Sequence, residues 1–294
     1  MGRILAIANQ KGGVGKSTTA VNLSSALAEA GRRVLVVDVD PQGNTTSGLG
    51  IDKSALERCI YDVLLDTCQM EAVLVPTENP NLSLAPATLR LAGAEIELVS
   101  AISRESRLAR ALAPMRKRFD DILLDCPPSL GLLTVNSMTS ADGVLIPIQC
   151  EFYALEGLTQ LLDVVALVGR HLNPSLAVEG VVLTMVDGRL NLTNQVADEV
   201  RQHFGDRVYR TAIPRNVKLS EAPSFGRSVL AYEPRSRGAE AYRELAKEVI
   251  AREQGNSSEG SRSRPVLVDS AGSTRRGERE RLFAEQRRAQ SSGR

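Results

Sequence analysis

The chain has 294 residues, of which 43% are hydrophobic and 24% are charged, and its 36 Lys and Arg residues nearly balance 35 Asp and Glu. This balance excludes a disordered acidic chain and a uniformly basic one, while the length and apolar content allow a substantial core. Aromatic residues make up only 3% of the chain and Trp is absent, which argues against a surface that binds nucleic acid by base stacking.

The cysteines and the apolar runs indicate a soluble cytoplasmic protein. Cys59, Cys68, Cys126 and Cys150 share no short spacing, so the sequence predicts neither a zinc site nor a disulfide framework. Buried free thiols in a reducing compartment are the simpler interpretation. The opening apolar run, residues 4–8, is too short for a signal-peptide core, and no uninterrupted run reaches the roughly 18 residues of a membrane-spanning helix.

Short apolar runs alternate with helical patterns through most of the chain. Several runs are too uniformly apolar to leave one face in water, which is typical of parallel strands covered on both sides. Apolar residues at helical spacing predict helices within residues 20–30, 192–204 and 239–249. The alternation predicts an α/β fold over residues 1–254, a doubly wound and mainly parallel sheet flanked by helices. The predicted strands are residues 4–8, 34–37, 122–124, 144–146, 181–183 and 208–213.

The composition changes near residue 254. Residues 255–294 are rich in Ser, Gly and Arg, with nine Arg against five acidic residues and few apolar ones. We therefore expect a disordered tail. Its segment 279–288 could instead form a helix on a partner or a membrane surface, although one Leu-Phe pair offers little apolar area to bury.

A glycine-rich segment joins the first predicted strand to the first predicted helix. Successive backbone N–H groups in such a turn face a phosphate at the helix N-terminus, where the helix dipole also favours negative charge. The pattern G-x-x-x-x-G-K-[ST] is not met, because Gln10 stands in place of its first Gly and a second lysine, Lys11, follows. A turn without a ligand is the plain alternative. The residues predicted to bind the phosphates are Lys11, Gly12, Gly13, Val14, Gly15, Lys16, Ser17 and Thr18.

Three acidic residues follow the ends of predicted strands, where α/β sheets bind their ligands. Alternation along the second strand places Asp38 and Asp40 on the same side of it. Asp125 ends a later apolar run in the Walker B position and is predicted to hold Mg²⁺ through water, with the Ser17 hydroxyl on the same ion. Acids that cap a loop or a helix are the alternative interpretation. With Lys16 reaching the β- and γ-phosphates, this set predicts a Mg²⁺-dependent nucleotide site.

These motifs resemble the deviant Walker A ATPases, the group that contains the ParA and Soj partition proteins, MinD and the nitrogenase iron protein. The resemblance implies that Lys11 reaches across a homodimer interface to the nucleotide of the other subunit, supplying a cation in trans as an arginine finger does. It assigns Asp40 to positioning or activating the attacking water, and it places Asp38 beside it near the metal.

The resemblance also bears on the base of the nucleotide. It implies that Pro214 and Asn216 contact adenine. The stretch 184–187 lacks the Lys that a guanine signature would place there, so ATP is expected rather than GTP. The expected cofactors are therefore ATP and Mg²⁺.

The likeness to the short ParA or Soj type covers residues 1–252. Such proteins form ATP-bound homodimers that bind double-stranded DNA of the nucleoid without sequence preference, and a ParB-like (Spo0J-like) centromere-binding partner stimulates their ATP hydrolysis. The resemblance therefore implies an ATPase that drives chromosome or plasmid segregation. Because the first predicted strand starts at residue 4, we expect no N-terminal helix-turn-helix of the kind found in longer plasmid versions.

Local charge agrees with a DNA-binding surface. Residues 207–227 contain five basic residues against one acid, and phosphate contacts from such a cluster would be non-specific and salt-dependent. Arg189 and Lys218 match DNA contacts of the family, and Arg215 and Arg227 lie in the same basic segment as Lys218. A solvated face, with Arg215 serving the nucleotide pocket, is the alternative.

Other classes of protein share parts of this pattern. A MinD-like protein that positions a membrane-associated or protein cargo would use the tail as an amphipathic anchor, but the tail has a poor apolar face. A redox function like that of the iron protein would need paired cysteines around a shared cluster. A structural DNA-bridging protein would keep the nucleotide site without partner-stimulated hydrolysis.

Overall fold

The computed structural model describes residues 1–151 and 158–258. The strands within these ranges are β1 (Arg3–Ile7), β2 (Val34–Asp38), β3 (Val75–Pro76), β4 (Leu82–Ala85), β5 (Asp121–Asp125), β6 (Gly143–Gln149) and β7 (Ala177–Thr184). They form one sheet in the order β3-β4-β2-β5-β1-β6-β7, parallel except for the antiparallel pair β3 and β4. The expected disordered tail, residues 255–294, lies outside the described residues from 259 onward.

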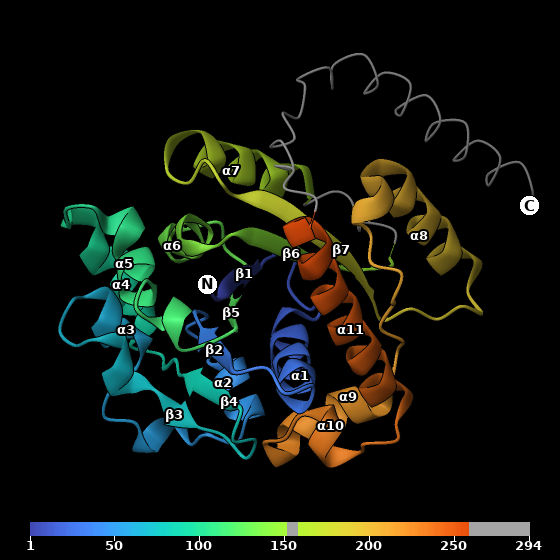
Figure 1. Cartoon of the computed structure of the whole chain (residues 1–294), viewed down its shortest axis with the longest axis horizontal. Coiled ribbons are helices and arrows are strands. Elements are labelled where there is room, and N and C mark those ends of the chain that lie inside the picture. Colours follow the sequence, from blue (N-terminus) through green and yellow to red (C-terminus); the bar gives the residue numbers. More distant parts are fainter. Residues whose placement is uncertain (152–157, 259–294) are drawn as a thin grey trace, which may run out of the picture.

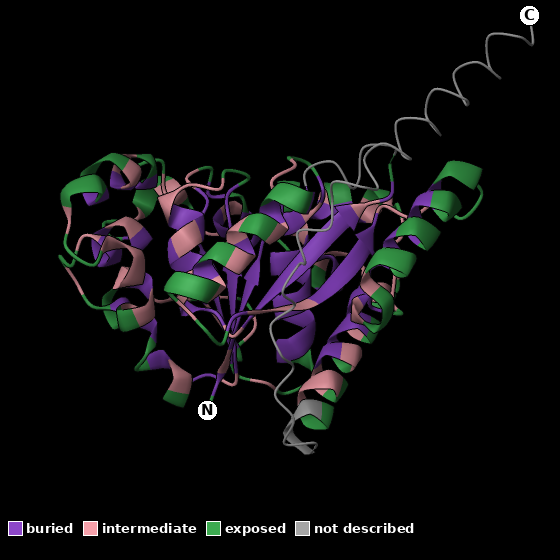
Figure 2. Cartoon of the chain, turned by 90° about the horizontal axis from the view of Figure 1, so that it is seen from above, coloured by how far each residue is buried: buried purple, intermediate pink, exposed green. Residues whose placement is uncertain are grey.

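The central strands are buried on both faces, as the sequence predicts for a parallel sheet. Every residue of β2 and β5 is buried, and so is every residue of β6 except its last. Alternate side chains enter two separate cores, with Leu5 and Ile7 in one and Ile4 and Ala6 in the other. Figure 2 shows buried strands between helices whose outer surfaces are exposed.

Helices cover both faces of this sheet (Figure 1). They are α1 (Lys16–Glu29), α2 (Asn44–Gly48), α3 (Ile60–Leu64), α4 (Leu91–Glu97), α5 (Arg107–Leu112), α6 (Leu132–Ser140), α7 (Leu158–His171), α8 (Asn191–Phe204), α9 (Val217–Glu221), α10 (Val229–Tyr232) and α11 (Arg237–Ser258). One face carries α1, α9, α10 and α11, and the other carries α3 to α8. The predicted doubly wound α/β fold is confirmed, and its three predicted helices are α1, α8 and α11.

The first helix is fixed to the last one. Thr19 Oγ1 and Tyr242 OH share a hydrogen bond of 3.2 Å in the core between α1 and α11. Asn22 Oδ1 accepts a hydrogen bond of 2.7 Å from the backbone N of Val229 in α10. Because α1 begins at the glycine-rich segment, this packing fixes the direction in which the N-terminus of α1 points.

The predicted strand at residues 208–213 is wrong. The segment meets β7 only near its two ends, through a bridge of Val208 to Val181 and through backbone hydrogen bonds from Tyr209 and Ile213 to Val181 and Leu183. Between them, the backbone N–H groups of Arg210 and Thr211 donate to the carboxylate of Glu248 on α11, at 2.9 and 3.1 Å. A helix side chain thus takes donors that a strand would give to β7. An apolar run does not show which acceptors its N–H groups find, so the sequence pattern misses this.

Helix lengths differ widely along the chain. Helices α2 to α5 have only five to seven residues each, too short to complete a recognisable apolar period, and the sequence pattern does not predict them. In contrast, α11 has 22 residues. None of the helices within the described ranges combines the length and the apolarity needed to cross a bilayer.

Candidate functional site

The glycine-rich segment forms the turn between β1 and α1. Gly13 has φ +76° and Gly15, which precedes α1, has φ +90°. L side chains rarely adopt these angles, so both positions favour glycine. A Cβ at Gly12 or Gly13 would meet no atom of the described residues within 4 Å. The front of the turn is therefore open to a ligand or to another molecule.

The turn is tied to the neighbouring strands by two side chains, Thr184 and Asn9, whose anchoring role the sequence analysis did not predict. Thr184, the last residue of β7, donates from Oγ1 to the carbonyl oxygen of Val14 at 2.8 Å. Asn9 accepts from the backbone N of Lys11 at 3.0 Å and donates to the carbonyl oxygen of Pro147 on β6 at 2.7 Å. Polar residues at strand ends are the signal that could have indicated these anchors.

The two lysines of the turn have opposite surroundings. Lys16 is 7% exposed and its Nζ donates to the carbonyl oxygen of Lys11 at 3.1 Å. Burial lowers the pKa of Lys16, and the charges of Asp125 and Asp40 act against this shift. Lys11 keeps 35% of its side chain exposed, and its Nζ lies 3.7 Å from the Glu151 carboxylate. Lys16 therefore faces the acids behind the turn, while Lys11 lies at its rim.

Asp125 ends β5 directly behind the turn and is fully buried. Its Oδ2 accepts a hydrogen bond of 2.8 Å from Thr45 Oγ1. Its Oδ1 is buried and has no hydrogen-bond partner within the described part of the chain. Burial raises the pKa of Asp125, and the hydroxyls of Ser17 and Thr45 act against this shift.

The other two acids lie at the end of β2, beside Asp125. Asp38 on β2 lies next to Asp125 in the register of the neighbouring strand β5. Its carboxylate oxygens accept hydrogen bonds from the backbone N and Oγ1 of Thr46 at 2.8 and 2.7 Å and from the backbone N of Asp40 at 3.2 Å. Burial and the charge of Asp125 raise the pKa of Asp38. Asp40 is 7% exposed and accepts from the backbone N of Gln42 at 2.9 Å.

These contacts indicate which residues fit a magnesium ion. The unpaired Asp125 Oδ1 is an anionic acceptor next to Ser17 in the first turn of α1, and hard oxygen ligands suit Mg²⁺. The oxygens of Asp38 already hold three hydrogen bonds, so the geometry favours Asp125 and Ser17 over Asp38 as ligands. The described residues contain no group of three His, Cys, Asp or Glu that could hold a metal. Mg²⁺ at such sites commonly takes one or two protein groups and completes its shell with water and phosphate.

The end of β7 brings the expected adenine contacts near the turn. Pro214 forms an isolated parallel β-bridge with Val186. The backbone N of Val186 donates a hydrogen bond to the carbonyl oxygen of Ile213 at 3.0 Å. Met185 has φ +53°, a strained angle for a residue with a side chain. Asn216 caps α9 by accepting from the backbone N of Lys218 at 2.8 Å. The contacts of Pro214 and Asn216 with adenine stay predictions.

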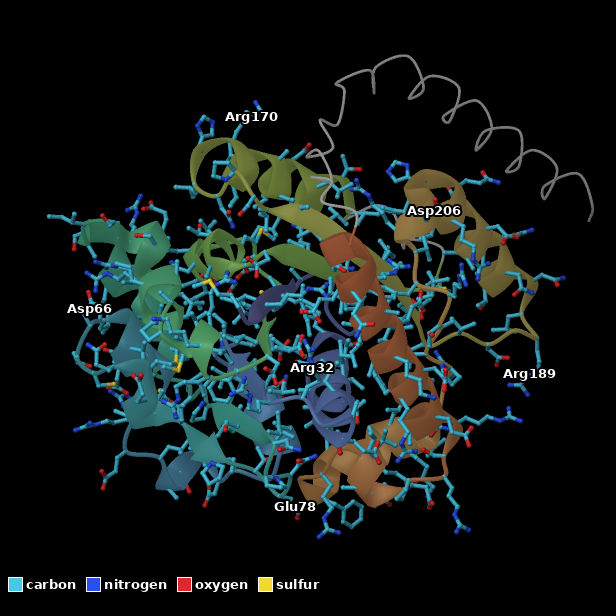
Figure 3. All side chains as sticks on the ribbon, in the orientation of Figure 1. Arg32, Asp66, Glu78, Arg170, Arg189 and Asp206 are labelled. Atoms are coloured by element: carbon cyan, nitrogen blue, oxygen red, sulfur yellow. The ribbon has the colours of Figure 1, made fainter. Side chains whose placement is uncertain are left out.

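Three of the four basic residues expected to contact DNA are paired with acids of the same chain. The fourth, Arg215, is exposed and helps to lower the pKa of Asp187, for which Arg189 is the main cause. Figure 3 shows Arg189 at the outer part of the connection between β7 and α8. Counting charge in the segment 207–227 included Glu221 but missed Asp187 and Glu78, which lie outside it. The pairs are Arg189 and Asp187 at 2.6 Å, Lys218 and Glu221 at 2.9 Å, and Arg227 and Glu78 at 3.3 Å.

Comparison with known proteins gives consistent matches over most of the chain. Residues 2–178 match the family described as AAA domain. The sporulation initiation inhibitor protein Soj of Bacillus subtilis is 60% identical over 251 residues, which cover 85% of this chain and 99% of that protein. The chromosome partitioning protein ParA of Caulobacter vibrioides is 54% identical over 254 residues, which cover 86% and 95%. A solved structure of cobyrinic acid a,c-diamide synthase from Mycobacterium smegmatis, with a bound ATP analogue and magnesium, is 38% identical with a TM-score of 0.77 and covers 91% of this chain and 100% of that one.

Proposed function

Because this chain belongs to the ParA/Soj partitioning ATPases, a family with an AAA-type P-loop domain, we propose that it binds ATP and Mg²⁺ and hydrolyses ATP as a homodimer to move a chromosome or plasmid. The two partition proteins are more similar in sequence to this chain than the M. smegmatis synthase is. The structure of that synthase supports the ligands of the proposal, since it holds an ATP analogue and magnesium.

The observation that carries the proposal is the division between the two lysines. Lys16 is buried against Asp40 and Asp125, where it would neutralise phosphates bound by its own subunit. Lys11 lies at the open rim of the turn, held only loosely by Glu151 at 3.7 Å. A lysine at the rim suits a contact with the nucleotide of a second subunit, and such a contact would make hydrolysis depend on dimerisation.

The chemistry follows from the side chains behind the turn. Asp125 and Ser17 would hold Mg²⁺, which when bound neutralises charge on the β- and γ-phosphates. Asp40 would orient the attacking water, because a carboxylate at the end of β2 lies on the phosphate side of the sheet. The backbone N–H groups of the turn would receive the phosphate oxygens at the N-terminus of α1.

In the same proposal, the ATP-bound dimer binds double-stranded DNA without sequence preference. Two copies would double the number of basic side chains on one surface, with Arg189, Arg215, Lys218 and Arg227 contributed by each copy. Contacts to phosphate are strongly salt-dependent and carry no sequence information. A ParB-like partner would stimulate hydrolysis and release the dimer.

The test is retention of the purified chain on double-stranded DNA with ATP, with ADP and without nucleotide, at several salt concentrations. We expect retention only with ATP, and faster ATP hydrolysis when DNA and the ParB-like protein of the same organism are added together. Equal retention under all three conditions would contradict the proposal. Asp40→Ala should bind ATP and remain on DNA, and normal turnover by this variant would remove the role of Asp40.

A further inference from the structure

Three of the basic residues after β7, namely Arg189, Lys218 and Arg227, each pair with an acid of the same chain. We call the exposed region that carries these three pairs the compensated surface. Its acids come from different parts of the fold: Glu78 follows β3, Asp187 follows β7, and Glu221 ends α9. In Figure 3, Arg189 and Glu78 mark two of its outer points. The residues of the compensated surface are Glu78, Asp187, Arg189, Lys218, Glu221 and Arg227.

The pair around Glu221 is supported by two aromatic side chains. Its Oε2 accepts from Lys218 Nζ at 2.9 Å and from Tyr232 OH at 3.1 Å. The Lys218 ammonium also lies 5.6 Å from the centre of the Tyr232 ring, and Phe225 stacks on that ring at 4.9 Å. Lys218 and, to a lesser degree, Tyr232 lower the pKa of Glu221, so this carboxylate stays ionised at neutral pH.

The other two acids act on cations in the same way. Asp187 lies between two of them, because Arg189 pairs with it directly and Arg215 adds a weaker charge effect that also lowers its pKa. Glu78 reaches Arg227 across 149 positions of sequence. The side chains of Arg189, Arg227 and Glu78 are 89%, 51% and 64% exposed, whereas that of Asp187 is 17% exposed. Ion pairs beside water are weak, so a phosphate of DNA can displace the acid from its cation. Breaking the pair costs free energy, however, and this cost reduces the net free energy of DNA binding.

We propose that Glu78, Asp187 and Glu221 are competitors of DNA phosphate that set the affinity of this surface. A single copy, with its cations engaged, binds DNA weakly. Two copies double the net gain from phosphate contacts, whereas the entropic cost of association with DNA arises only once. The acids would thus make DNA binding depend on dimerisation. This inference rests on the proposed function, because it assumes that the ATP-bound dimer binds DNA.

The first test measures the Kd of the ATP-bound chain for double-stranded DNA as a function of salt. Glu221→Gln keeps an oxygen for the Tyr232 hydroxyl but removes the negative charge. The Kd should fall about two- to fivefold, the range expected from an exposed ion pair. The plot of log affinity against log salt should become steeper by about 0.9 for each cation that is freed. The triple variant Glu78→Gln, Asp187→Asn, Glu221→Gln should bind about tenfold more tightly or better, and some DNA binding should persist with ADP.

A matched control removes one acid on the opposite side of the molecule. Asp66 pairs with Arg107 at 2.7 Å and Arg110 at 3.7 Å, and Figure 3 shows it far from Arg189. Its φ of +58° is an angle that Asn tolerates well, so Asp66→Asn should fold normally. This variant has the same net charge as Glu221→Gln, and its DNA affinity should equal that of the unaltered chain.

The outcomes distinguish failure of the inference from failure of the proposed function. If the unaltered chain binds DNA with ATP but Glu221→Gln and the triple variant bind no more tightly, the inference is wrong and the proposed function stands. If Asp66→Asn raises the affinity as much as Glu221→Gln, net charge alone explains the effect and the inference is again wrong. If the unaltered chain does not bind DNA with ATP even at low salt, the proposed function fails and the inference falls with it.

Discussion

The phosphate turn and the compensated surface are both rich in charge, but they hold it in opposite ways. Around the turn, Lys16, Asp38 and Asp125 are at most 7% exposed, and each faces a few fixed partners. On the compensated surface the cations are half exposed or more, except Lys218, which is 41% exposed. Charges interact strongly in a buried site and weakly beside water. Single substitutions should therefore switch the first region off and only adjust the second.

The largest expected effect belongs to the buried lysine. Lys16→Ala should reduce ATP hydrolysis by about 10²-fold or more, the usual effect of removing one preorganised charge donor from a catalytic site. It should also weaken ATP binding, which a fluorescent nucleotide analogue would measure.

Lys11→Ala is the control for that experiment, since it changes the other lysine of the same turn. Because Lys11 lies at the rim, a single subunit should still bind ATP with nearly normal affinity. ATP hydrolysis should be abolished. ATP-dependent dimerisation, which light scattering would measure, should be abolished as well. If ATP affinity falls as far as in Lys16→Ala, the two lysines do not have separate roles.

The anchor of the phosphate turn gives the second prediction. Thr184→Val keeps the shape of the side chain but leaves the buried carbonyl oxygen of Val14 without its donor. The free energy of unfolding should fall by about 1–3 kcal/mol, the cost of an unsatisfied buried polar group. Chemical denaturation would measure it, with Thr193→Val on α8 as a comparison, since Thr193 is also buried. Equal stability of Thr184→Val and the unaltered chain would contradict the anchoring role.

The third prediction moves to the exposed region. Lys218→Ala should weaken DNA binding by the ATP-bound chain several-fold. The slope of log affinity against log salt concentration should become less steep by about one unit for each phosphate that the surface no longer neutralises. The free energy of unfolding should change by less than about 0.5 kcal/mol, because the pair with Glu221 is exposed. A large decrease in stability would mean that this surface is structural rather than adjustable.

The smallest effect concerns an exposed ion pair outside both regions. Arg33 pairs with Asp120 at 2.7 Å and, as the main cause, lowers the pKa of Asp120 to about 2. A folded-state pKa below the ordinary value of 3.8 means that the pair stabilises the fold above about pH 4 and loses this effect as the pH falls toward 2. Asp120→Asn should lower stability slightly at pH 7 and not at pH 2. A constant difference across this range would show that the charge is not the cause.

Sequence patterns located the buried region well. The spacing from Gln10 to Ser17 and the acids at strand ends are local features, and in a parallel sheet the carboxyl ends of strands meet at one edge. Asp38, Asp40 and Asp125 therefore come together behind the turn as expected. The hydroxyls of Thr45 and Thr46 that hold these acids were not foreseen, because a small polar residue in a loop has many equivalent partners.

The exposed region was harder to predict because the acid of one of its pairs is distant in sequence from its cation. The basic segment 207–227 contains one acid, yet Arg227 is neutralised by Glu78 from the connection after β3. The strand expected at residues 208–213 failed for the same reason, since Glu248 on α11 captures two of its N–H groups. Pairings of this kind depend on tertiary contacts that no local period records.

The end of β7 gives the two regions a common support. Thr184 holds the phosphate turn through Val14, and two residues later Val186 exchanges backbone hydrogen bonds with Ile213 and Arg215, just before α9. Neither the turn nor the start of α9 can shift far without straining the same three-residue stretch, in which Met185 already has a left-handed angle. The end of β7 is thus a shared point of attachment for two binding regions, the site for phosphate and the surface for a polyanion.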